Sequence, residues 1–585
     1  MKRVIKIFLL CVLVLAVTIS ILVTGLYIYV KEEVTTPREI SSATLRNIQQ
    51  GTLIGFETDN GAHAWLGIPY AQPPVATLRW KAPRPALGWP GTYQAVDFSS
   101  DCSQPWRGSE DCLYLNVWAP NVVKPDKPLP VMFWIHGGGN TGGSSNSVSY
   151  DGANLASAHG LIVVSINYRL GPLGWFRHPA LRTDSPEDNS GNYGTLDIIE
   201  ALKWVRDNIL EFGGDNENVT IFGESAGGFN VLSMLASPQA KGLFHKAIVQ
   251  SGGIDITPVA LAENYFDDIN PGSPKSSKEM VNNLLVIDSS AQDGPPMTRQ
   301  TAKAQQEAMQ AEEIVSYMMA KSPDQIFSAF AFQDPNQEES QKRKNRGQPN
   351  IFGDGFVLPS GSETSVLFSD TSRYNAVPII LGTNRDEVTI WNLTNKTYVK
   401  TLFSVLPIGF KDLKGYQKMI RYNSDLWKLR GVDSLASLMK KAQGEKVFAY
   451  RWDLDDLRNL GFIDLKVLLG ASHAMEIPFV FGNLTNSMRI YYQNSMTAET
   501  EAVSTSMMSY WAQFAYTGDP GRGRSGQEVE WTEWQNGELE QQRLMIFDST
   551  SDRGNRMSPE RITRAMLEAR LLKDGPFEDT LSWSK

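Results

Sequence analysis

The side chain best placed for covalent chemistry is Ser225, which lies in the pattern Gly-Glu-Ser-Ala-Gly. An apolar run from Val219 to Phe222 precedes this pattern, and a helical pattern that starts at Phe229 follows it. Glycines beside a serine between a strand and a helix permit a sharp turn that pushes the hydroxyl outward. The helix N-terminus beneath that oxygen favours developing negative charge. The pattern predicts an acyl-transfer nucleophile; the alternative is a glycine-rich turn with an incidental serine.

A second glycine cluster supplies candidate hydrogen-bond donors for an oxyanion. His136 comes directly after an apolar run and is followed by three glycines. Bare backbone N–H groups in such a loop can approach a substrate oxygen, and removing one such donor typically costs about 3 to 4 kcal/mol in the transition state. We expect the N–H groups of Gly138, Gly139 and Ala226 to form this hole. His136 is predicted to be structural, because it precedes the serine and the order expected for this kind of site is serine, acid, histidine.

That chain order also narrows the choice of a general base. The chain has 6 histidines, and His245 follows the serine too closely to leave room for a strand that carries the acid. His473 is therefore the predicted base, and activity should fall below a pH of about 6 to 7, where the imidazole protonates. Asp386 and Glu387 both follow an apolar run at a suitable place, and their spacing does not choose between them. This chemistry needs no metal and no cofactor.

These groups must be positioned by short apolar runs that alternate with helical patterns. Continuous apolarity is typical of strands covered by helices on both sides, so the sequence predicts an α/β fold with a large, mostly parallel central sheet. An amphipathic helix is expected over Leu196 to Phe212, and another helix from Ser558 to Gly575, with Pro559 at its first position. The clearest predicted strands are Val131 to Ile135, Leu161 to Ile166, Val219 to Phe222, Ala247 to Gln250 and Val377 to Leu381.

The composition is that of a globular protein, with 42% hydrophobic and 20% charged residues. A formal net charge of -9 argues against a nucleic-acid partner, because such partners require basic surfaces. No internal repeat and no second domain is evident after the N-terminal region. We therefore expect one catalytic domain over residues 43–585 and a small-molecule substrate.

The N-terminal region has a different character. From Ile7 to Val30 the chain carries no charged side chain, and a helix of that length would measure about 36 Å, enough to span a bilayer core of about 30 Å. Basic residues within the stub 1–6 predict a cytoplasmic N-terminus. The expected order is the stub, a transmembrane anchor over 7–30, a linker over 31–42 and a periplasmic or extracellular domain. A cleaved signal peptide, and hence secretion, is the alternative.

The body of the chain contains two cysteines, Cys102 and Cys112. If this part of the chain is exported, the pair could form a disulfide that closes a short loop; otherwise the two residues would be free thiols.

The sequence resembles the type-B carboxylesterase and cholinesterase-like family of the α/β-hydrolase superfamily. The resemblance extends from about Gly55 to Phe547 and rests on several segments. They are Gly-Ile-Pro-Tyr-Ala at 67–71, Ser-Glu-Asp-Cys-Leu-Tyr-Leu-Asn at 109–116, Asn-Tyr-Arg at 167–169, Phe-Gly-Gly-Asp at 212–215, Gly-Thr-Asn-Arg-Asp-Glu at 382–387 and Trp-Ala-Gln-Phe-Ala at 511–515. It implies a single large catalytic domain with the serine at the bottom of a gorge. It also assigns the acid to Glu387 and leaves Asp386 as the second choice.

Two features differ from the family pattern. The loop between the cysteines is shorter than in cholinesterases, so its Trp106 cannot be equated with the aromatic that holds choline there. Phe229 and Asn230 are bulkier than the small residues expected after the serine turn. The predicted function is therefore hydrolysis of small to medium carboxylic esters through Ser225, Glu387 and His473. The alternatives are a lipase for longer lipid esters and a non-catalytic adhesion protein with the same fold.

Overall fold

The computed structural model describes residues 38–121, 127–290, 297–332, 350–361, 363–460, 463–484, 491–492, 498–537 and 540–575. Among these residues, no helix combines the length and apolarity that a membrane crossing requires. The anchor predicted over 7–30 lies outside the described residues, as do the stub and most of the predicted linker.

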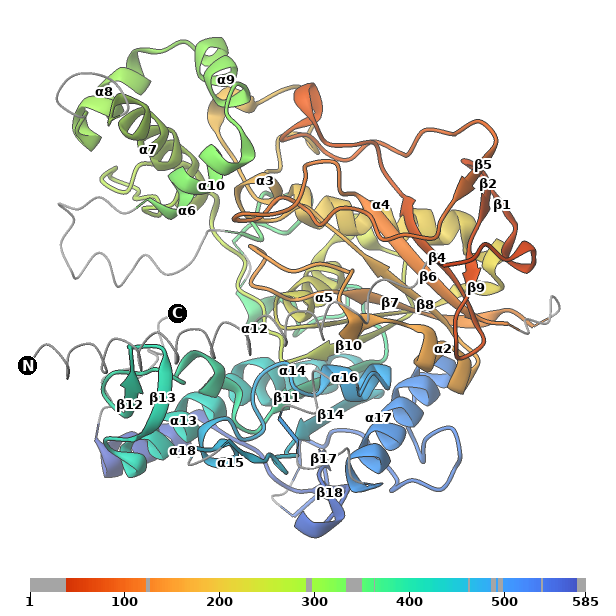
Figure 1. Cartoon of the computed structure of the whole chain (residues 1–585). Helices are drawn as coiled ribbons and strands as arrows, with labels where there is room; N and C mark the ends of the chain where they lie inside the picture. Colours follow the sequence, from red (N-terminus) through yellow and green to blue (C-terminus); the bar gives the residue numbers. More distant parts are fainter. Residues whose placement is uncertain are drawn as a thin grey trace, which may run out of the picture.

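In the described part of the chain, an 11-stranded sheet runs through the centre of the molecule in the order β18-β17-β14-β11-β10-β9-β7-β8-β6-β4-β3 (Figure 1). The neighbouring strands from β17 to β8 pair in parallel, whereas β18 at one edge and β6, β4 and β3 at the other pair antiparallel. The predicted α/β fold with a mostly parallel sheet is confirmed. The strands are β3 (Phe56–Glu57), β4 (Ala62–Pro69), β6 (Tyr114–Pro120), β7 (Leu129–Ile135), β8 (Ile162–Ile166), β9 (Gly214–Glu224), β10 (Lys246–Gln250), β11 (Ile379–Asn384), β14 (Val447–Trp452), β17 (Leu544–Phe547) and β18 (Arg556–Ser558).

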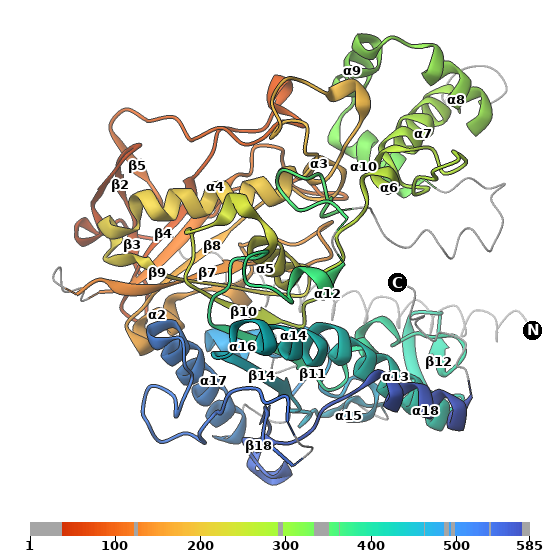
Figure 2. The same ribbon diagram turned by 180° about the vertical axis from the view of Figure 1, so that it is seen from behind.

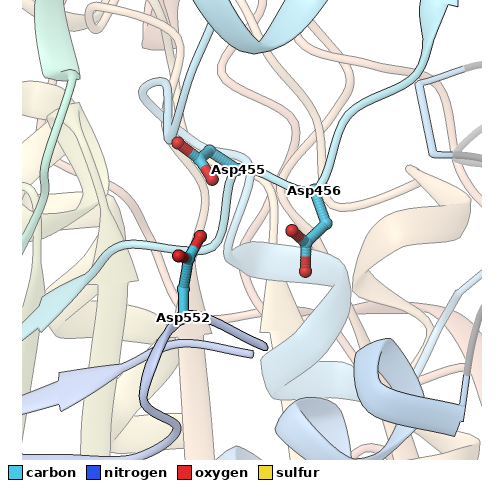
Figure 3. A group of neighbouring side chains, drawn as sticks. All are labelled: Asp455, Asp456 and Asp552. Atoms are coloured by element: carbon cyan, nitrogen blue, oxygen red, sulfur yellow. The ribbon is translucent and has the colours of Figure 1, made fainter. Parts of the chain in front are cut away.

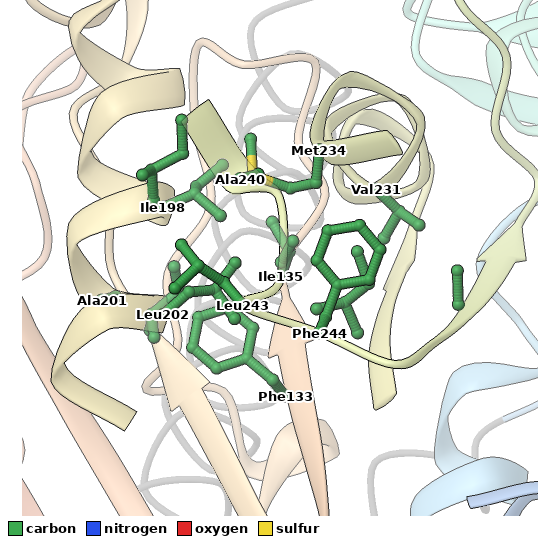
Figure 4. Packing of buried hydrophobic residues seen from close by; sticks show 14 of the residues in the cluster. Phe133, Ile135, Ile198, Ala201, Leu202, Val231, Met234, Ala240, Leu243 and Phe244 are labelled. Carbon is green, nitrogen blue, oxygen red and sulfur yellow. The ribbon is translucent and has the colours of Figure 1, made fainter. Parts of the chain in front are cut away.

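The central strands are apolar because both faces of the sheet are covered. In β7, Phe133 and Ile135 belong to the core beneath α4 (Tyr193–Asn208) and α5 (Ala226–Ala236) (Figure 4). Met132 and Trp134 belong to the opposite core. That core contains α2 (Ala153–His159), α16 (Ile477–Phe481) and α17 (Ala498–Thr517). Each large side chain that is fully buried in this way contributes roughly 1.5 to 3 kcal/mol.

Other elements extend this layered body. A group of helices lies at one end of the molecule (Figures 1 and 2): α6 (Val259–Glu263), α7 (Ser277–Ser290), α8 (Arg299–Ala308), α9 (Ala311–Met319) and α10 (Pro323–Ala331). Side chains of α7 to α10 form a separate apolar core with residues such as Trp80 and Phe176. The 3-10 helix η7 (Glu387–Trp391), the hairpin of β12 (Val399–Leu402) and β13 (Leu406–Phe410), and α13 (Leu413–Lys428) follow β11. Besides several short 3-10 helices, the other strands and helices are β1 (Arg46–Ile48), β2 (Gly51–Ile54), β5 (Thr92–Gln94), α3 (Gly171–Gly174), α12 (Thr364–Leu367), the π-helical turn η8 (Leu429–Asp433), α14 (Ser434–Gln443), β15 (Asn459–Leu460), β16 (Ile463–Asp464), α15 (Leu465–Leu468) and α18 (Arg564–Asp574).

The C-terminal helix begins later than the sequence pattern predicts. Ser558 ends β18, where it pairs with Leu544 in the antiparallel ladder. The helix α18 begins at Arg564, and its N-cap is Thr563, whose side chain accepts a hydrogen bond from Met566 N. The prediction of a helix start at Ser558 was wrong, because pairing with a neighbouring strand takes precedence over a local Ser-Pro capping signal.

Candidate active site

Ser225 lies in the turn between β9 and α5 with φ 55° and ψ −124°, a conformation that non-glycine residues rarely adopt. The turn is tight because backbone atoms crowd its glycines: a Cβ atom on Gly227 would lie 1.9 Å from Ile135 O, and one on Gly223 would lie 2.6 Å from the same oxygen. The serine N–H donates to Gln250 O at 3.0 Å, which fixes the turn to β10. Strain of this kind is typical of functional positions.

The glycine loop after β7 lies against this turn. A Cβ atom on Gly137 would lie 3.1 Å from Ser225 Cβ, so the two segments are in direct contact. Gly138 and Gly139 have φ values of 109° and 64° and are exposed. Ala226, the third predicted donor, is the first residue of α5. The loop that contains Gly138 and Gly139 thus contacts the serine turn at Gly137, and Ala226 directly follows the serine.

Glu387 is the acid that contacts the predicted base. Its Oε2 lies 2.5 Å from His473 Nδ1, and both side chains are buried. Its Oε1 accepts hydrogen bonds from Thr383 Oγ1 at 2.6 Å and from Asn384 N at 2.8 Å. Burial alone would raise the pKa of Glu387, but His473 and these donors outweigh burial and hold the pKa below its ordinary value.

The Asp386 carboxylate binds groups other than His473. Its Oδ2 accepts hydrogen bonds from the Arg385 guanidinium and from Ala471 N. The geometry therefore favours Glu387 over Asp386 as the partner of His473, as the family resemblance implies.

Two further buried carboxylates lie near the histidine, and neither was predicted from the sequence. Glu224 Oε1 lies 3.1 Å from His473 Nε2, although neither atom has a partner in hydrogen-bonding geometry. Glu476 is fully buried and accepts hydrogen bonds from Gln250 Nε2 at 3.0 Å and Asn384 Nδ2 at 2.7 Å. Glu224 could have been found from the sequence, because it is a charged residue at the end of an apolar strand and directly precedes Ser225. Nothing in the sequence around Glu476 indicates a role in the site, because only tertiary contacts bring this residue near the histidine.

These carboxylates determine the electrostatics of the base. Burial by itself lowers the pKa of His473, but the negative charges of Glu224 and Glu387 raise it to about 9. Burial also raises the pKa of Glu224 well above its ordinary value. The site thus contains buried titratable groups, Glu224, Glu387 and His473, whose charges shift one another's pKa values beside the strained serine.

Aromatic side chains line one side of the histidine. Trp391 and Trp427 stack with ring centroids 5.7 Å apart, and their centroids lie 4.8 Å and 5.3 Å from that of His473. Trp427 also lines a cavity of about 380 Å³ together with Phe229 and Gly253. Because Phe229 N donates to Ser225 O, this cavity lies one helical turn from the serine. A mainly apolar chamber beside the reacting groups is suited to an ester of moderate size.

His136 lies under the glycine loop, as predicted for a structural residue. It is buried and stacks on Tyr168 with a centroid distance of 4.4 Å. Burial lowers the pKa of His136 to about 4, so the ring is neutral at physiological pH. The Tyr168 hydroxyl donates to His136 O at 2.7 Å, which holds the strand end that carries the loop.

Asn230 and the loop between Cys102 and Cys112 support the glycine loop from two sides. Asn230 Nδ2 donates to Asn140 Oδ1 at 2.9 Å, so this unusually large residue joins α5 to the loop. A disulfide links Cys102 and Cys112. Within the loop that the disulfide closes, the Gln104 side chain exchanges two hydrogen bonds with the backbone of Gly143. Trp106, in the same loop, is 97% exposed.

One group of acidic side chains has the spacing of a metal site: Asp455, Asp456 and Asp552 (Figure 3). The Lys466 ammonium lies 2.9 Å from Asp455 Oδ1 and 3.4 Å from Asp552 Oδ2. A lysine therefore supplies the cationic charge between two of these carboxylates, and the arrangement matches an ion-pair network better than a cation site.

The chain was also compared with known proteins. The sequence profile of the carboxylesterase family matches residues 42–404 and 411–563. The para-nitrobenzyl esterase of Bacillus subtilis (strain 168) is 34% identical over 518 residues, which cover 84% of this chain and 92% of that relative. The fumonisin B1 esterase of Sphingopyxis macrogoltabida is 33% identical over 505 residues, covering 82% of this chain and 83% of the relative. A solved structure of a PNB esterase superposes with a TM-score of 0.65 at 29% identity and covers 91% of this chain and 100% of its own.

Proposed function

Because the chain belongs to the carboxylesterase family and is an ester-hydrolysing enzyme, we propose that it acts through Ser225, Glu387 and His473 by an acyl-enzyme mechanism. The observation that carries this proposal is the 2.5 Å contact between His473 Nδ1 and Glu387 Oε2 beside the strained Ser225 turn. A buried carboxylate at Nδ1 fixes the imidazole tautomer that leaves Nε2 free to take a proton.

The proposed reaction has two halves. In the first, the Ser225 hydroxyl attacks the ester carbonyl while its proton passes to His473 Nε2, and the alcohol then leaves with that proton. In the second, water attacks the acyl-serine by the same route and releases the carboxylic acid. The N–H groups of Gly138, Gly139 and Ala226 stabilise the oxyanion in both halves.

The proposed substrates are small to medium carboxylic esters. The 380 Å³ cavity beside Phe229 and Trp427 has room for one substituent of an ester of this size. Two relatives bear names that refer to different esters, a para-nitrobenzyl ester and fumonisin B1. A preference for choline esters is not proposed, since Trp106 faces solvent.

We also propose that the apolar segment 7–30 anchors the enzyme in a membrane, with the catalytic domain on the periplasmic or extracellular side. The uncharged run and the basic residues before it support this topology. Protease protection of a C-terminal tag in inverted membrane vesicles tests the orientation, and release of the activity by a salt wash would contradict an integral anchor.

The mechanism is tested by treating the full chain with a fluorophosphonate probe and assaying p-nitrophenyl acetate in parallel. The probe should label Ser225, identified by mass spectrometry of the peptide, and the Ser225→Ala variant should lose both labelling and turnover. The matched control is Ser525→Ala, which changes an exposed serine away from the site and should retain both. Full turnover by Ser225→Ala would overturn the mechanism.

A further inference from the structure

The hairpin of β12 and β13 exposes an unusual run of apolar side chains. Phe403 and Val405, at and beside its tip, are 85% and 72% exposed. Leu402, Leu406 and Ile408 continue the same surface at 44%, 49% and 37% exposure. Soluble proteins rarely present contiguous apolar side chains in this way without a partner.

The exposed face is held in place by the other face of the hairpin. Val399 and Phe410 pack in a small core with Tyr416 and Met419 of α13, and the rings of Phe410 and Tyr416 are 5.1 Å apart. At the tip, Phe403 adopts a φ of 53°, which is unfavourable for a bulky side chain. A strained aromatic that is also exposed carries two costs to stability, and such features persist mainly where they serve a function.

Lysines are frequent on the hairpin, just before it and at the start of α13. Lys396, Lys400, Lys411 and Lys414 are exposed, whereas the Lys418 ammonium pairs with Asp574 at 3.0 Å. Between Lys396 and Lys418 the sequence contains one acidic residue, Asp412, whose side chain caps α13 through Gly415 N. The formal net charge of the whole chain is -9, so this cluster is a local reversal of sign. Basic side chains around an apolar tip are complementary to a bilayer with anionic headgroups.

In the chain, the hairpin follows the 3-10 helix η7, which lies beside the candidate active site. Trp391, the last residue of η7, is 58% exposed and its ring lies 4.8 Å from that of His473. The helix η7 packs against α13. The hairpin also lies beside α13 (Figure 1). Exposed apolar side chains thus occur at Trp391, beside the histidine, and again from Leu402 to Ile408 of the hairpin that follows it in the chain.

We propose that this hairpin, defined by residues 399–410, inserts its apolar tip into the interface of an anionic lipid bilayer and holds the Trp391 side of the candidate active site toward the membrane. The bilayer is preferred to other partners because the sequence before Arg38 contains an uncharged segment, 7–30, long enough to span a membrane. If the proposed esterase function holds, esters dissolved in the membrane enter the site without crossing bulk water.

Insertion is tested with the full chain reconstituted in vesicles of phosphatidylcholine, with and without phosphatidylserine. In a Cys11→Ala background, Val405→Cys is labelled with an environment-sensitive nitrobenzoxadiazole fluorophore. The matched control is Leu210→Cys, which labels a 57% exposed leucine on a different surface. We expect a several-fold rise in fluorescence at position 405, quenching by nitroxide-labelled lipids, and a larger response with phosphatidylserine, but none of these at position 210.

Other results would overturn the proposal. Equal, unquenched signals at the two positions would show that the hairpin stays in water. A fluorophore at position 405 that is shielded before vesicles are added, and is not quenched by labelled lipids, would show that another segment of this chain or a second copy covers the face. Because this measurement does not depend on turnover, its failure is distinct from failure of the proposed esterase function.

A second variant connects insertion to substrate delivery. Phe403→Asp should leave hydrolysis of water-soluble p-nitrophenyl acetate unchanged and should reduce hydrolysis of a long-chain p-nitrophenyl ester dissolved in the vesicles several-fold. Leu210→Asp is the control and should change neither rate. Equal rates of Phe403→Asp and the unaltered enzyme on the vesicle-borne ester would refute the delivery role. If the unaltered enzyme hydrolysed neither ester, the proposed function would be refuted instead.

Discussion

The pH at which activity is lost on acidification should depend on Glu224. His473 is 5% exposed, with Glu387 at Nδ1 and Glu224 Oε1 3.1 Å from Nε2. These charges raise the pKa of His473 to about 9. A general base must be neutral to accept a proton. A raised pKa of His473 therefore moves the acid limb, the pH range over which kcat/KM falls on acidification, to higher pH. We therefore expect the limb above the pH of about 6 to 7 that an unperturbed histidine would give.

The Glu224→Gln variant keeps the shape of the side chain and removes the negative charge that Glu224 carries when it is ionised. An opposite charge within about 4 to 6 Å typically changes a pKa by about 1 to 3, and a change of about 1 corresponds to about 1.36 kcal/mol. The acid limb of the variant should therefore move down by about one pH unit or more. At a pH below the limb, lowering the pKa of the imidazole by about 1 raises its neutral fraction about tenfold.

The assay is kcat/KM for p-nitrophenyl acetate measured from acid to alkaline pH, corrected for spontaneous hydrolysis. The control is Glu217→Gln, which removes an exposed carboxylate that lies 3.8 Å from a different histidine, His245. This control should leave the profile in place. An acid limb that is identical in Glu224→Gln and in the unaltered enzyme would refute the argument that Glu224 is ionised when His473 titrates.

Three further outcomes are expected. Glu387→Gln should lower kcat by about 10⁴ because the tautomer of the base is lost, whereas Asp386→Asn should change it only a few-fold; equal losses in both variants would contradict the assignment of the acid. Gly137→Ala should lower kcat by about 10² to 10³, since its Cβ would press on the Ser225 turn and displace the oxyanion donors, and an unchanged kcat with an intact circular dichroism spectrum would argue against this contact. Replacing both Cys102 and Cys112 by serine should lower the free energy of unfolding by about 2 to 4 kcal/mol, measured as a lower denaturation temperature, and an unchanged temperature would show that the disulfide contributes nothing.

Much of the fold could be predicted from the sequence because its signals are local. The strands are continuous apolar runs, and each predicted run overlaps a strand of the central sheet. The glycines around Ser225 were also informative, because a tight turn excludes side chains whatever the rest of the fold does. The predicted membrane anchor stays a prediction, because it lies outside the described residues.

Features that depend on tertiary contacts could not be predicted in this way. Asp386 and Glu387 are neighbours with the same chemistry, and what separates them is that Arg385 and Ala471 engage the first while His473 meets the second. Ser558 shows the same limit for secondary structure, since a strand partner far away in the sequence determines its conformation.

The register of the parallel strands explains why distant segments meet at one place. Ile135 pairs with Gly223, and Gln250 pairs with both Glu224 and Gly382, so the carboxyl ends of four strands are level. Sites in open α/β sheets form at such ends. A slip of one residue would reverse the face on which each side chain lies and would separate these groups.

Gln250 shows how this register also permits buried charge. Its backbone oxygen accepts from Ser225 N, while its side chain donates to Glu476 and accepts from Trp511 Nε1. A buried carboxylate is tolerated only where hydrogen-bond donors replace water, and here one strand-end residue provides such a donor and also holds the serine turn. The precision of the site and the burial of its acidic groups therefore share a physical origin, the alignment of parallel strands whose ends carry polar side chains in an otherwise apolar sheet.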